Sequence, residues 1–476
     1  MDEPSDRVQV VSRPADLATP DTTSLISDAA SPGINSASLG LGPALHRPAA
    51  FLDLQRTVGN RATAGLLQHE PGAGGRGDSS SVPIGPGGLV QTEVVQQWPA
   101  VQRYDSYEHA STGDAAAGGA TLTVNGVQIT SGEVNALADL YATLEDLQKA
   151  DPTELQACVD LVRKQVQDPK SVTEADWDKA TNGRYSRLNL ANSAHFGPSK
   201  KAPLGGTTGA DNRSTWELYF RQALGIARQV AGPLTSPTLD DAMLPNSFGE
   251  HFLMDAFSAG HLFNKDDMMA TMTEKLTALK AAELDGLLSA VAAGTWAAHA
   301  AEIGKYQGSK YWIWFDMNSA DRWKAVLASV YDDPDGKEAL EGAVVKSAHD
   351  KLSADGVKVK NGFAEWTLSG DRTLATSPDT QAQITLALED GRQRLKLVSE
   401  APGVAAPDDD QVAEMRKHFP EPVEEAQKTI DALLAKISDP KGGMADAIVG
   451  VVNKEITATL EGIATAKPDK FRPKPS

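Results

Sequence analysis

The sequence predicts a mostly α-helical protein with minor β-hairpins behind a long N-terminal leader. Apolar residues recur at helical spacing through most of residues 99–400, and two short segments there have strand patterns. The first 98 residues are instead rich in Ser, Pro, Gly and Ala and contain no Lys. With 476 residues and a hydrophobic fraction of 41%, the chain can fill a large core. We therefore expect a multi-helix domain over residues 99–400 that follows a disordered leader over residues 1–98.

The leader contains one segment with a different pattern. Residues 71–88 have the composition of a flexible linker, but in residues 50–68 apolar side chains such as Phe51, Leu54 and Val58 fall on one helical face. This pattern predicts a short helix near 50–68. The simplest interpretation is an amphipathic helix that packs on the main domain or on nothing.

The elements after the leader follow in order. Residues 121–130 alternate around Asn125-Gly126, which predicts a hairpin, and residues 361–371 predict a small strand pair. The composition of residues 401–410 predicts a second linker, and residues 466–476 are predicted to be a frayed tail. We therefore treat 401–476 as a third region. The helices are predicted over 132–150, 153–167, 213–231, 245–258, 271–303, 320–331, 337–354, 376–399, 411–436 and 443–465, the last two as a helical hairpin.

Charge and cysteine content exclude several classes of function. The net charge of −19 argues against nucleic acid as a partner, because phosphate contacts need a basic surface. It also gives no attraction to anionic membranes. Cys158 is the only cysteine, so it can form no internal disulfide and no cysteine-based zinc site. Any metal must therefore be bound by histidines and carboxylates.

No targeting or membrane segment is visible. The first 20 residues lack a basic stretch followed by an apolar one, so no signal peptide is predicted. No run approaches 18 apolar residues, so no transmembrane segment is predicted. We expect a cytoplasmic protein, unless it is exported by a route that needs no signal peptide.

The strongest chemical pattern lies in residues 246–261. His251 and Asp255 are four positions apart, so a helix places both side chains on one face, where one metal ion can bind both. The small residues 258–260 then allow the backbone to turn and to bring His261 to the same place. The alternative is a buried histidine hydrogen-bonded to a helix carboxylate, with an unrelated surface histidine.

The remaining histidines favour a metal site. Of nine histidines in the chain, six lie in the part expected to fold. Besides His251 and His261 these are His109, His195, His299 and His349. His299 lies in an Ala-rich helical segment, and we expect it to have a structural role rather than to bind metal.

The segment from His251 to His261, His-Phe-Leu-Met-Asp-Ala-Phe-Ser-Ala-Gly-His, resembles the bacterial zinc-dependent phospholipase C superfamily, which also includes single-strand nucleases. The spacing of its three metal-binding positions is the same. The resemblance extends more weakly over roughly residues 100–375. The segments that carry it are 103–109, 132–141, 192–196 and 349–371.

This resemblance implies a site with two or three zinc ions. It implies that Asp255 is the carboxylate that bridges two of the ions, and that Asp255 and Asp139 are the catalytic residues. Two departures matter. Secreted members use the amino group of an N-terminal Trp as a ligand, which Glu108 or another group must replace here, and Ser353 stands where the usual late Glu is expected. The implied metal ligands are His109, Asp139, His195, His251, Asp255, His261 and His349, with Asp350 or Asp355 as candidates for the missing Glu.

The leader carries a second resemblance. The segment Leu54-Gln55-Arg56-Thr57-Val58-Gly59-Asn60-Arg61-Ala62, followed by Leu66-Leu67-Gln68, is similar to a leader motif of bacterial proteins associated with extracellular contractile injection systems. It implies loading into a phage-tail-like particle. Such a route would reconcile export with the missing signal peptide.

Together these observations predict a zinc-dependent phosphodiesterase of phospholipase C type that hydrolyses phospholipid head groups and is a cargo of an injection particle. One alternative is a nuclease or phosphatase on the same scaffold. A nuclease would need aromatic side chains that stack on bases and basic groups that line its cleft. Another is a non-catalytic adaptor of the particle, which would bind less than one zinc ion per chain.

Overall fold

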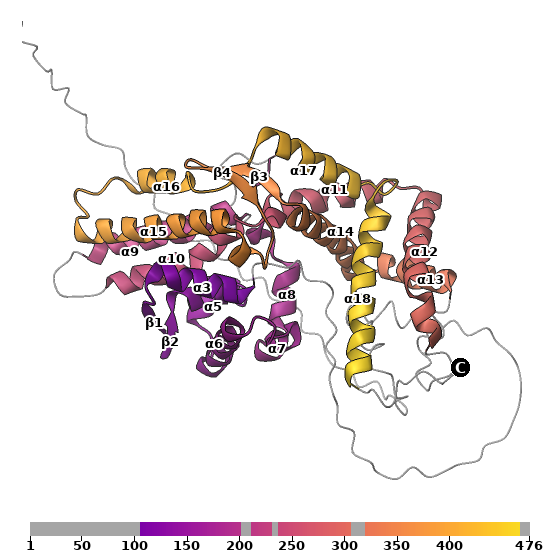
Figure 1. Ribbon diagram of the computed structural model, residues 1–476, viewed down its shortest axis with the longest axis horizontal. Helices are drawn as coiled ribbons and strands as arrows, with labels where there is room; N and C mark the ends of the chain where they lie inside the picture. Colours follow the sequence, from indigo (N-terminus) through magenta and orange to yellow (C-terminus); the bar gives the residue numbers. More distant parts are fainter. Residues whose placement is uncertain (1–104, 201–210, 231–236, 306–318, 467–476) are drawn as a thin grey trace, which may run out of the picture. The chain divides into compact units, whose positions relative to one another are not determined.

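The computed structural model describes residues 105–200, 211–230, 237–305 and 319–466, and it is mostly helical, as predicted (Figure 1). The expected leader and its helix at 50–68 lie outside these residues. The described α-helices are α3 (Ser106–Ala117), α4 (Ser131–Leu137), α5 (Leu144–Gln148), α6 (Pro152–Gln167), α7 (Glu174–Ala180), α8 (Arg184–Leu190), α9 (Asn212–Val230), α10 (Leu239–Asp255), α11 (Lys265–Thr277), α12 (Ala281–Lys305), α13 (Ala320–Asp332), α14 (Pro334–Asp355), α15 (Pro378–Glu400), α16 (Asp408–Arg416), α17 (Glu424–Ile437) and α18 (Met444–Ala466). Short 3-10 turns are η1 (Ser193–His195), η2 (Ala259–His261) and η4 (Leu374–Thr376), and the strands are β1 (Thr121–Val124), β2 (Val127–Thr130), β3 (Val357–Lys360), β4 (Glu365–Leu368) and β5 (Glu421–Pro422).

Helix α10 is the centre of one group of helices and packs against α3, α4, α9 and α15. It begins with a capping box, in which Thr238 and Asp241 each accept a hydrogen bond from the other's backbone N–H. Every residue from Pro245 to Asp255 is buried. A helix buried on all sides shows no polar face. Polar side chains on α10 are therefore held inside the protein.

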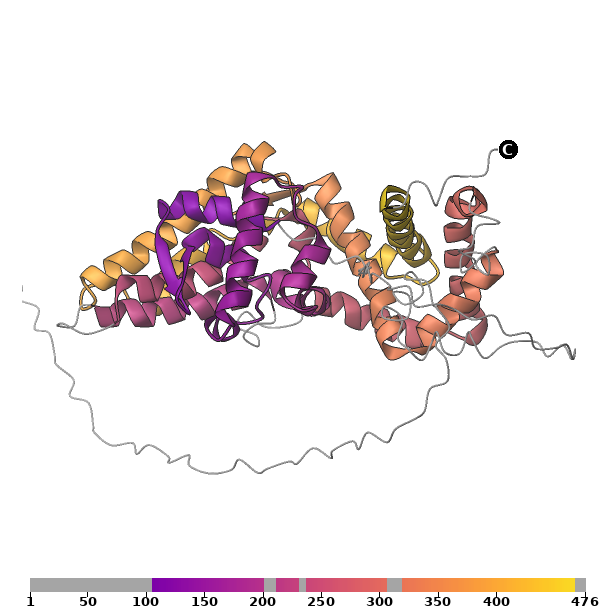
Figure 2. The same cartoon turned by 90° about the horizontal axis from the view of Figure 1, so that it is seen from below.

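Helix α14 is the centre of a second group and packs against η2, α11, α13, α17 and α18 (Figures 1 and 2). Asp333 caps its N-terminus by accepting from Gly336 N, and Pro334 takes the first position, where no backbone N–H is needed. Its contact with η2 brings α14 to the segment that directly follows α10.

Two small antiparallel sheets complete the described fold. Strands β1 and β2 pair with Thr121 opposite Thr130, and Asn125 and Gly126 both have positive φ, as the predicted Asn-Gly hairpin requires. The second sheet has the order β4-β3-β5. Its hairpin spans 357–368 rather than 361–371, because Asn361 accepts from the backbone N–H groups of Phe363 and Ala364 and so forms the turn.

Three predicted helices are interrupted. The 132–150 helix is two helices, α4 and α5, because Thr143 caps a new one by accepting from Asp146 N. The 271–303 helix is also two, α11 and α12, which end and begin on either side of residues 278–280. The 411–436 helix is interrupted by β5, which pairs with β3. The pattern of apolar residues gave no signal for the first two breaks, whereas Pro420 and Pro422 mark the third, because proline interrupts a helix.

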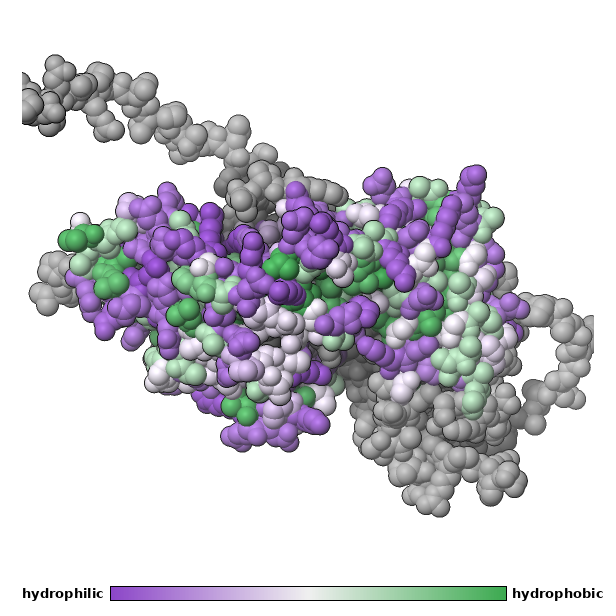
Figure 3. Space-filling view, turned by 45° about the horizontal axis from the view of Figure 1, so that its top comes forward, coloured by the Kyte–Doolittle hydropathy of each residue, from purple (hydrophilic) through white to green (hydrophobic). Residues whose placement is uncertain are grey.

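The C-terminal elements pack on the helices that precede them. Helix α16 contacts α9 and α15, α17 contacts α14 and β3, and α18 contacts α12 and α14. Residues 408–466 therefore share contacts with the predicted 99–400 domain. None of the described helices is long and apolar enough to cross a membrane. On the face shown in Figure 3, hydrophobic residues are interspersed among hydrophilic ones.

Candidate metal centre

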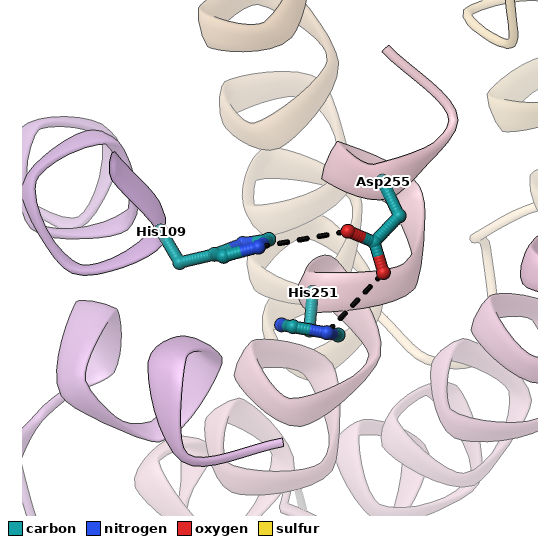
Figure 4. Close-up of side chains that lie close together, drawn as sticks. All are labelled: His109, His251 and Asp255. Atoms are coloured by element: carbon teal, nitrogen blue, oxygen red, sulfur yellow. Dashed lines mark ion pairs between the residues drawn. The ribbon is translucent and has the colours of Figure 1, made fainter. Parts of the chain in front are cut away.

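His251 and Asp255 lie on one face of α10, as their spacing predicts. His251 Nε2 is 3.2 Å from Asp255 Oδ2, and both side chains are fully buried. His109, from α3, faces the other oxygen of this carboxylate and stacks against the His251 ring with centroids 4.1 Å apart (Figure 4). Two helices far apart in sequence thus direct their polar groups toward one carboxylate.

The two oxygens of Asp255 face different histidines. Oδ2 lies 2.6 Å from His195 Nδ1 and 3.2 Å from His251 Nε2. Oδ1 lies 3.6 Å from His109 Nε2 and 3.7 Å from His261 Nδ1. Two atoms bound to one tetrahedral zinc ion at about 2.1 Å lie roughly 3.4 Å apart. The spacing around Oδ1 is therefore close to that of ligands that share an ion.

Asp139 and His195 complete the surroundings of His251. Asp139 Oδ1 is 3.5 Å from His251 Nε2, and His195 Nδ1 is 3.0 Å from the same nitrogen. Asp139, His195 and His251 can each offer one ligand atom to a common ion. We call these three residues the Asp139 group, and His109, His251 and Asp255 the His109 group.

The loop between α4 and α5 holds Asp139 at this position. Arg184 Nε donates to Leu140 O at 2.7 Å, and the guanidinium lies 4.4 Å above the Tyr141 ring. Arg184 also pairs with Glu154 of α6. The break in the predicted 132–150 helix thus lies at the site, because Asp139 is in the loop that follows α4 and that Arg184 contacts.

A third group joins α14 to the segment after β4. His261, His349 and Asp371 can each offer one atom to an ion, and we call them the Asp371 group. His349 Nε2 and Asp371 Oδ2 lie 3.0 Å apart. The two buried atoms face each other as an ion pair, and the His261 ring lies beside the His349 ring. Imidazole nitrogens and a carboxylate oxygen are ligand types that zinc takes, so this group fits a bound cation.

Asp371 is the one carboxylate that the sequence did not identify as a ligand. Ser258 Oγ donates to Asp371 Oδ1 at 2.6 Å and leaves Oδ2 turned toward His349. The candidates for this role were Asp350 and Asp355, and neither belongs to one of the three groups. Asp350 Oδ1 lies 3.4 Å from Nδ1 of His349, and Asp350 also binds Lys346 and Lys454. Asp355 binds Lys351 at the surface. The only sequence signal for Asp371 was its place in the weakly similar segment 349–371.

Small residues allow α14 to approach the site. A Cβ on Gly260 would lie 2.5 Å from His349 Nε2, and a Cβ on Gly370 would lie 2.1 Å from Ser353 Cβ. Such distances are far below van der Waals contact. Ala259 N also donates to Ser369 O at 3.0 Å, which joins η2 to the Asp371 segment. Ser353 therefore fills the space between two glycines, where a larger side chain would not fit.

The carboxylates of the site are held in their charged form. Burial by itself would raise the pKa of Asp255, but the nearby His251 and His195 rings hold it well below its usual range. Burial acts the same way on Asp371, and the charge of His349 lowers its pKa. Metal ligands must be deprotonated, so both carboxylates are ready to bind a cation.

All seven predicted ligands fall into these groups: His109, Asp139, His195, His251, Asp255, His261 and His349. His299 does not join them and lies 3.1 Å from Asn453 Oδ1 between α12 and α18. The described residues thus contain three groups of His and Asp side chains, linked through His251, Asp255 and His261, that can hold metal ions. In comparisons with known proteins, no family model, no curated protein and no solved structure matches this chain.

Proposed function

We propose that this protein is a zinc-dependent phosphodiesterase of phospholipase C type, in the superfamily that the segment from His251 to His261 resembles. The supporting observation is the placement of Asp255, whose two oxygens face two different sets of imidazoles. A carboxylate so placed suits a bridge between two ions. With the Asp371 group, the donor set suits two or three zinc ions.

Divalent ions bound there would supply positive charge for a phosphodiester and lower the pKa of a water molecule toward neutrality. Each oxygen of Asp255 would contribute to one of two sets of metal ligands. Asp139 would complete the set that contains His251 and would orient the water molecule that attacks the phosphodiester. Arg372 directly follows Asp371, and its side chain is 54% exposed, so the chain passes from the buried group to the surface within one residue. Its guanidinium is paired there with the carboxylate of Asp105.

The proposed substrate is a phospholipid head group, choline- or ethanolamine-type, on the strength of the resemblance. The proposed route is loading of the cytoplasmic protein into a contractile injection particle through the leader. An overall charge of −19 gives no support to nucleic acid as a substrate. Lipid extracts incubated with the protein and zinc should yield phosphocholine or its equivalent by mass spectrometry. Release of nucleotides from single-stranded nucleic acid, with lipids untouched, would favour the nuclease alternative.

The metal site is tested by His251→Ala. Because His251 belongs to two of the three groups, we expect the variant to lose at least one metal equivalent and its hydrolytic activity while most helices remain. Metal content per chain and circular dichroism measure the two effects. His418→Ala is the matched control, since His418 is buried and bonded to Asp390 at 2.9 Å outside the three groups. A wild-type protein that binds less than one zinc ion would instead indicate the adaptor.

A further inference from the structure

The turn that carries Asp371 has an unusual backbone. Arg372 has a φ of 63°, in the left-handed region that residues with a β-carbon avoid. A non-glycine residue remains in this conformation only when its surroundings impose it. The neighbouring Asp371 is a member of the third ligand group. Whatever imposes the turn therefore also sets the position of that carboxylate.

Glu108, on α3, holds this turn through its backbone. Its Oε2 accepts from Arg372 N at 3.0 Å and its Oε1 accepts from Leu374 N at 3.1 Å. The side chain is almost completely buried, with 3% of its surface exposed. A buried carboxyl group that lost these hydrogen bonds would be left unsatisfied at a cost in free energy. Both carboxylate oxygens thus bind the turn.

Asp105, which precedes α3, holds the same residue through its side chain. Arg372 Nε lies 2.7 Å from Asp105 Oδ2, and Nη2 donates to Asp105 Oδ1 at 3.1 Å. The start of α3 therefore fixes Arg372 at two independent places. The next residue after Glu108 is His109, whose ring faces Asp255. One short segment thus positions a ligand of the His109 group and the backbone beside a ligand of the Asp371 group.

We propose that Glu108 is a positioning residue that shapes the Asp371 turn and thereby forms the Asp371 group. Glu108 belongs to none of the three ligand groups, and its two oxygens accept backbone N–H groups of the turn. The metal-binding consequence rests on the proposed function. The shaping of the turn rests only on the hydrogen bonds to Arg372 and Leu374.

The test uses full-length protein with Glu108→Gln and Glu108→Ala. Asp178→Asn is the matched control, because Asp178 is a buried carboxylate that also accepts a backbone N–H, from Ser186 at 2.9 Å, away from the three groups. Circular dichroism verifies the fold, and Glu108→Gln, which keeps the shape and one oxygen acceptor, serves if Glu108→Ala does not fold.

Hydrogen exchange of the metal-free proteins measures the turn directly. We expect the protection of the Arg372 and Leu374 amides from exchange to fall at least tenfold in Glu108→Ala. In Glu108→Gln, which keeps one acceptor oxygen, we expect this fall at only one of the two amides. Asp178→Asn should leave both amides as they are. Unchanged protection in both Glu108 variants would overturn the proposal, whether or not the protein binds metal.

Metal content tests the consequence. If the wild type binds zinc, Glu108→Ala should lose about one equivalent and keep the rest, and the absorption spectrum of the cobalt-loaded protein should lose one component. Full zinc and cobalt binding in that variant would overturn the link between Glu108 and the Asp371 group. A wild type that binds no zinc would refute the proposed function, and the exchange data would still decide the role of Glu108 in the turn.

Discussion

Gly260 shows how one missing side chain makes room for the third ligand group. A β-carbon there would lie 2.4 Å from His349 Cδ2. Gly342, by contrast, lies in α14 with nothing within 4 Å of its potential Cβ. The two glycines are therefore a matched pair, one required by a neighbour and one not.

We expect Gly260→Ala to lower the free energy of unfolding by about 1–3 kcal/mol, because the ring of His349 must move. Because His349 is one of the proposed ligands, the displaced ring should also abolish metal binding by the Asp371 group. Gly342→Ala should raise the free energy of unfolding by roughly 0.5–1 kcal/mol, since alanine favours a helix over glycine. Urea denaturation and metal analysis measure both. Equal effects of the two substitutions would contradict the packing argument.

The residues of α10 were predictable because helical spacing alone joins His251 to Asp255. Asp371 was not, because its approach to His349 depends on contacts between segments distant in sequence. These are the Ala259–Ser369 backbone bond and the two bonds that Glu108 accepts. No periodicity in the sequence encodes such contacts, so the third group emerges only from the folded chain.

At the scale of elements, a buried ion pair joins α10 to α15. Arg392 Nε donates to Glu250 Oε1 at 2.9 Å, and a second nitrogen binds Oε2. Asn246 Nδ2 also donates to Glu250 Oε1, at 2.6 Å. Burial raises the pKa of Glu250, and the Arg392 charge counteracts this. Loss of Arg392 would therefore leave the effect of burial on the pKa of Glu250 without its main opposing contribution.

Arg392→Met should therefore destabilise the protein by about 3–5 kcal/mol, because it leaves a buried carboxylate without its counter-charge. In the double variant Glu250→Gln with Arg392→Met, most of this loss should be recovered. Denaturant titration of the wild type, both single variants and the double variant gives the coupling. If the double variant were as unstable as Arg392→Met, the loss would come from packing rather than from charge.

The helix breaks show a second limit of the sequence. Residues 132–150 have a continuous amphipathic pattern, yet the chain leaves the helix after α4 and begins again at Thr143. Arg184 and Tyr141 fix the intervening loop through contacts between separate elements. The helical class of the protein follows from periodicity, whereas the loop that positions Asp139 follows from tertiary packing.

At the scale of the whole molecule, the leader and the metal centre are predicted to act separately. The proposed ligands lie between residues 109 and 371, whereas the resemblance to injection-system leaders is confined to residues 54–68. Removal of residues 1–98 should leave metal content and hydrolytic activity unchanged and abolish association with the particle. A scrambled segment 50–68 in the full chain is the matched control and should abolish association alone. Loss of activity or solubility on deletion would show that the leader belongs to the folded enzyme.

The contact between Glu108 and Arg372 has a consequence for the order of events during synthesis. The two residues are 264 positions apart, and at roughly 5–20 residues per second the ribosome needs about 13–53 s to reach the second one. Until then α3 has emerged, but the turn that it holds does not exist. The nascent chain can offer only an incomplete set of ligands during this interval. If the protein binds zinc as proposed, its full complement of ions can therefore enter only after the segment that carries Asp371 has left the ribosome.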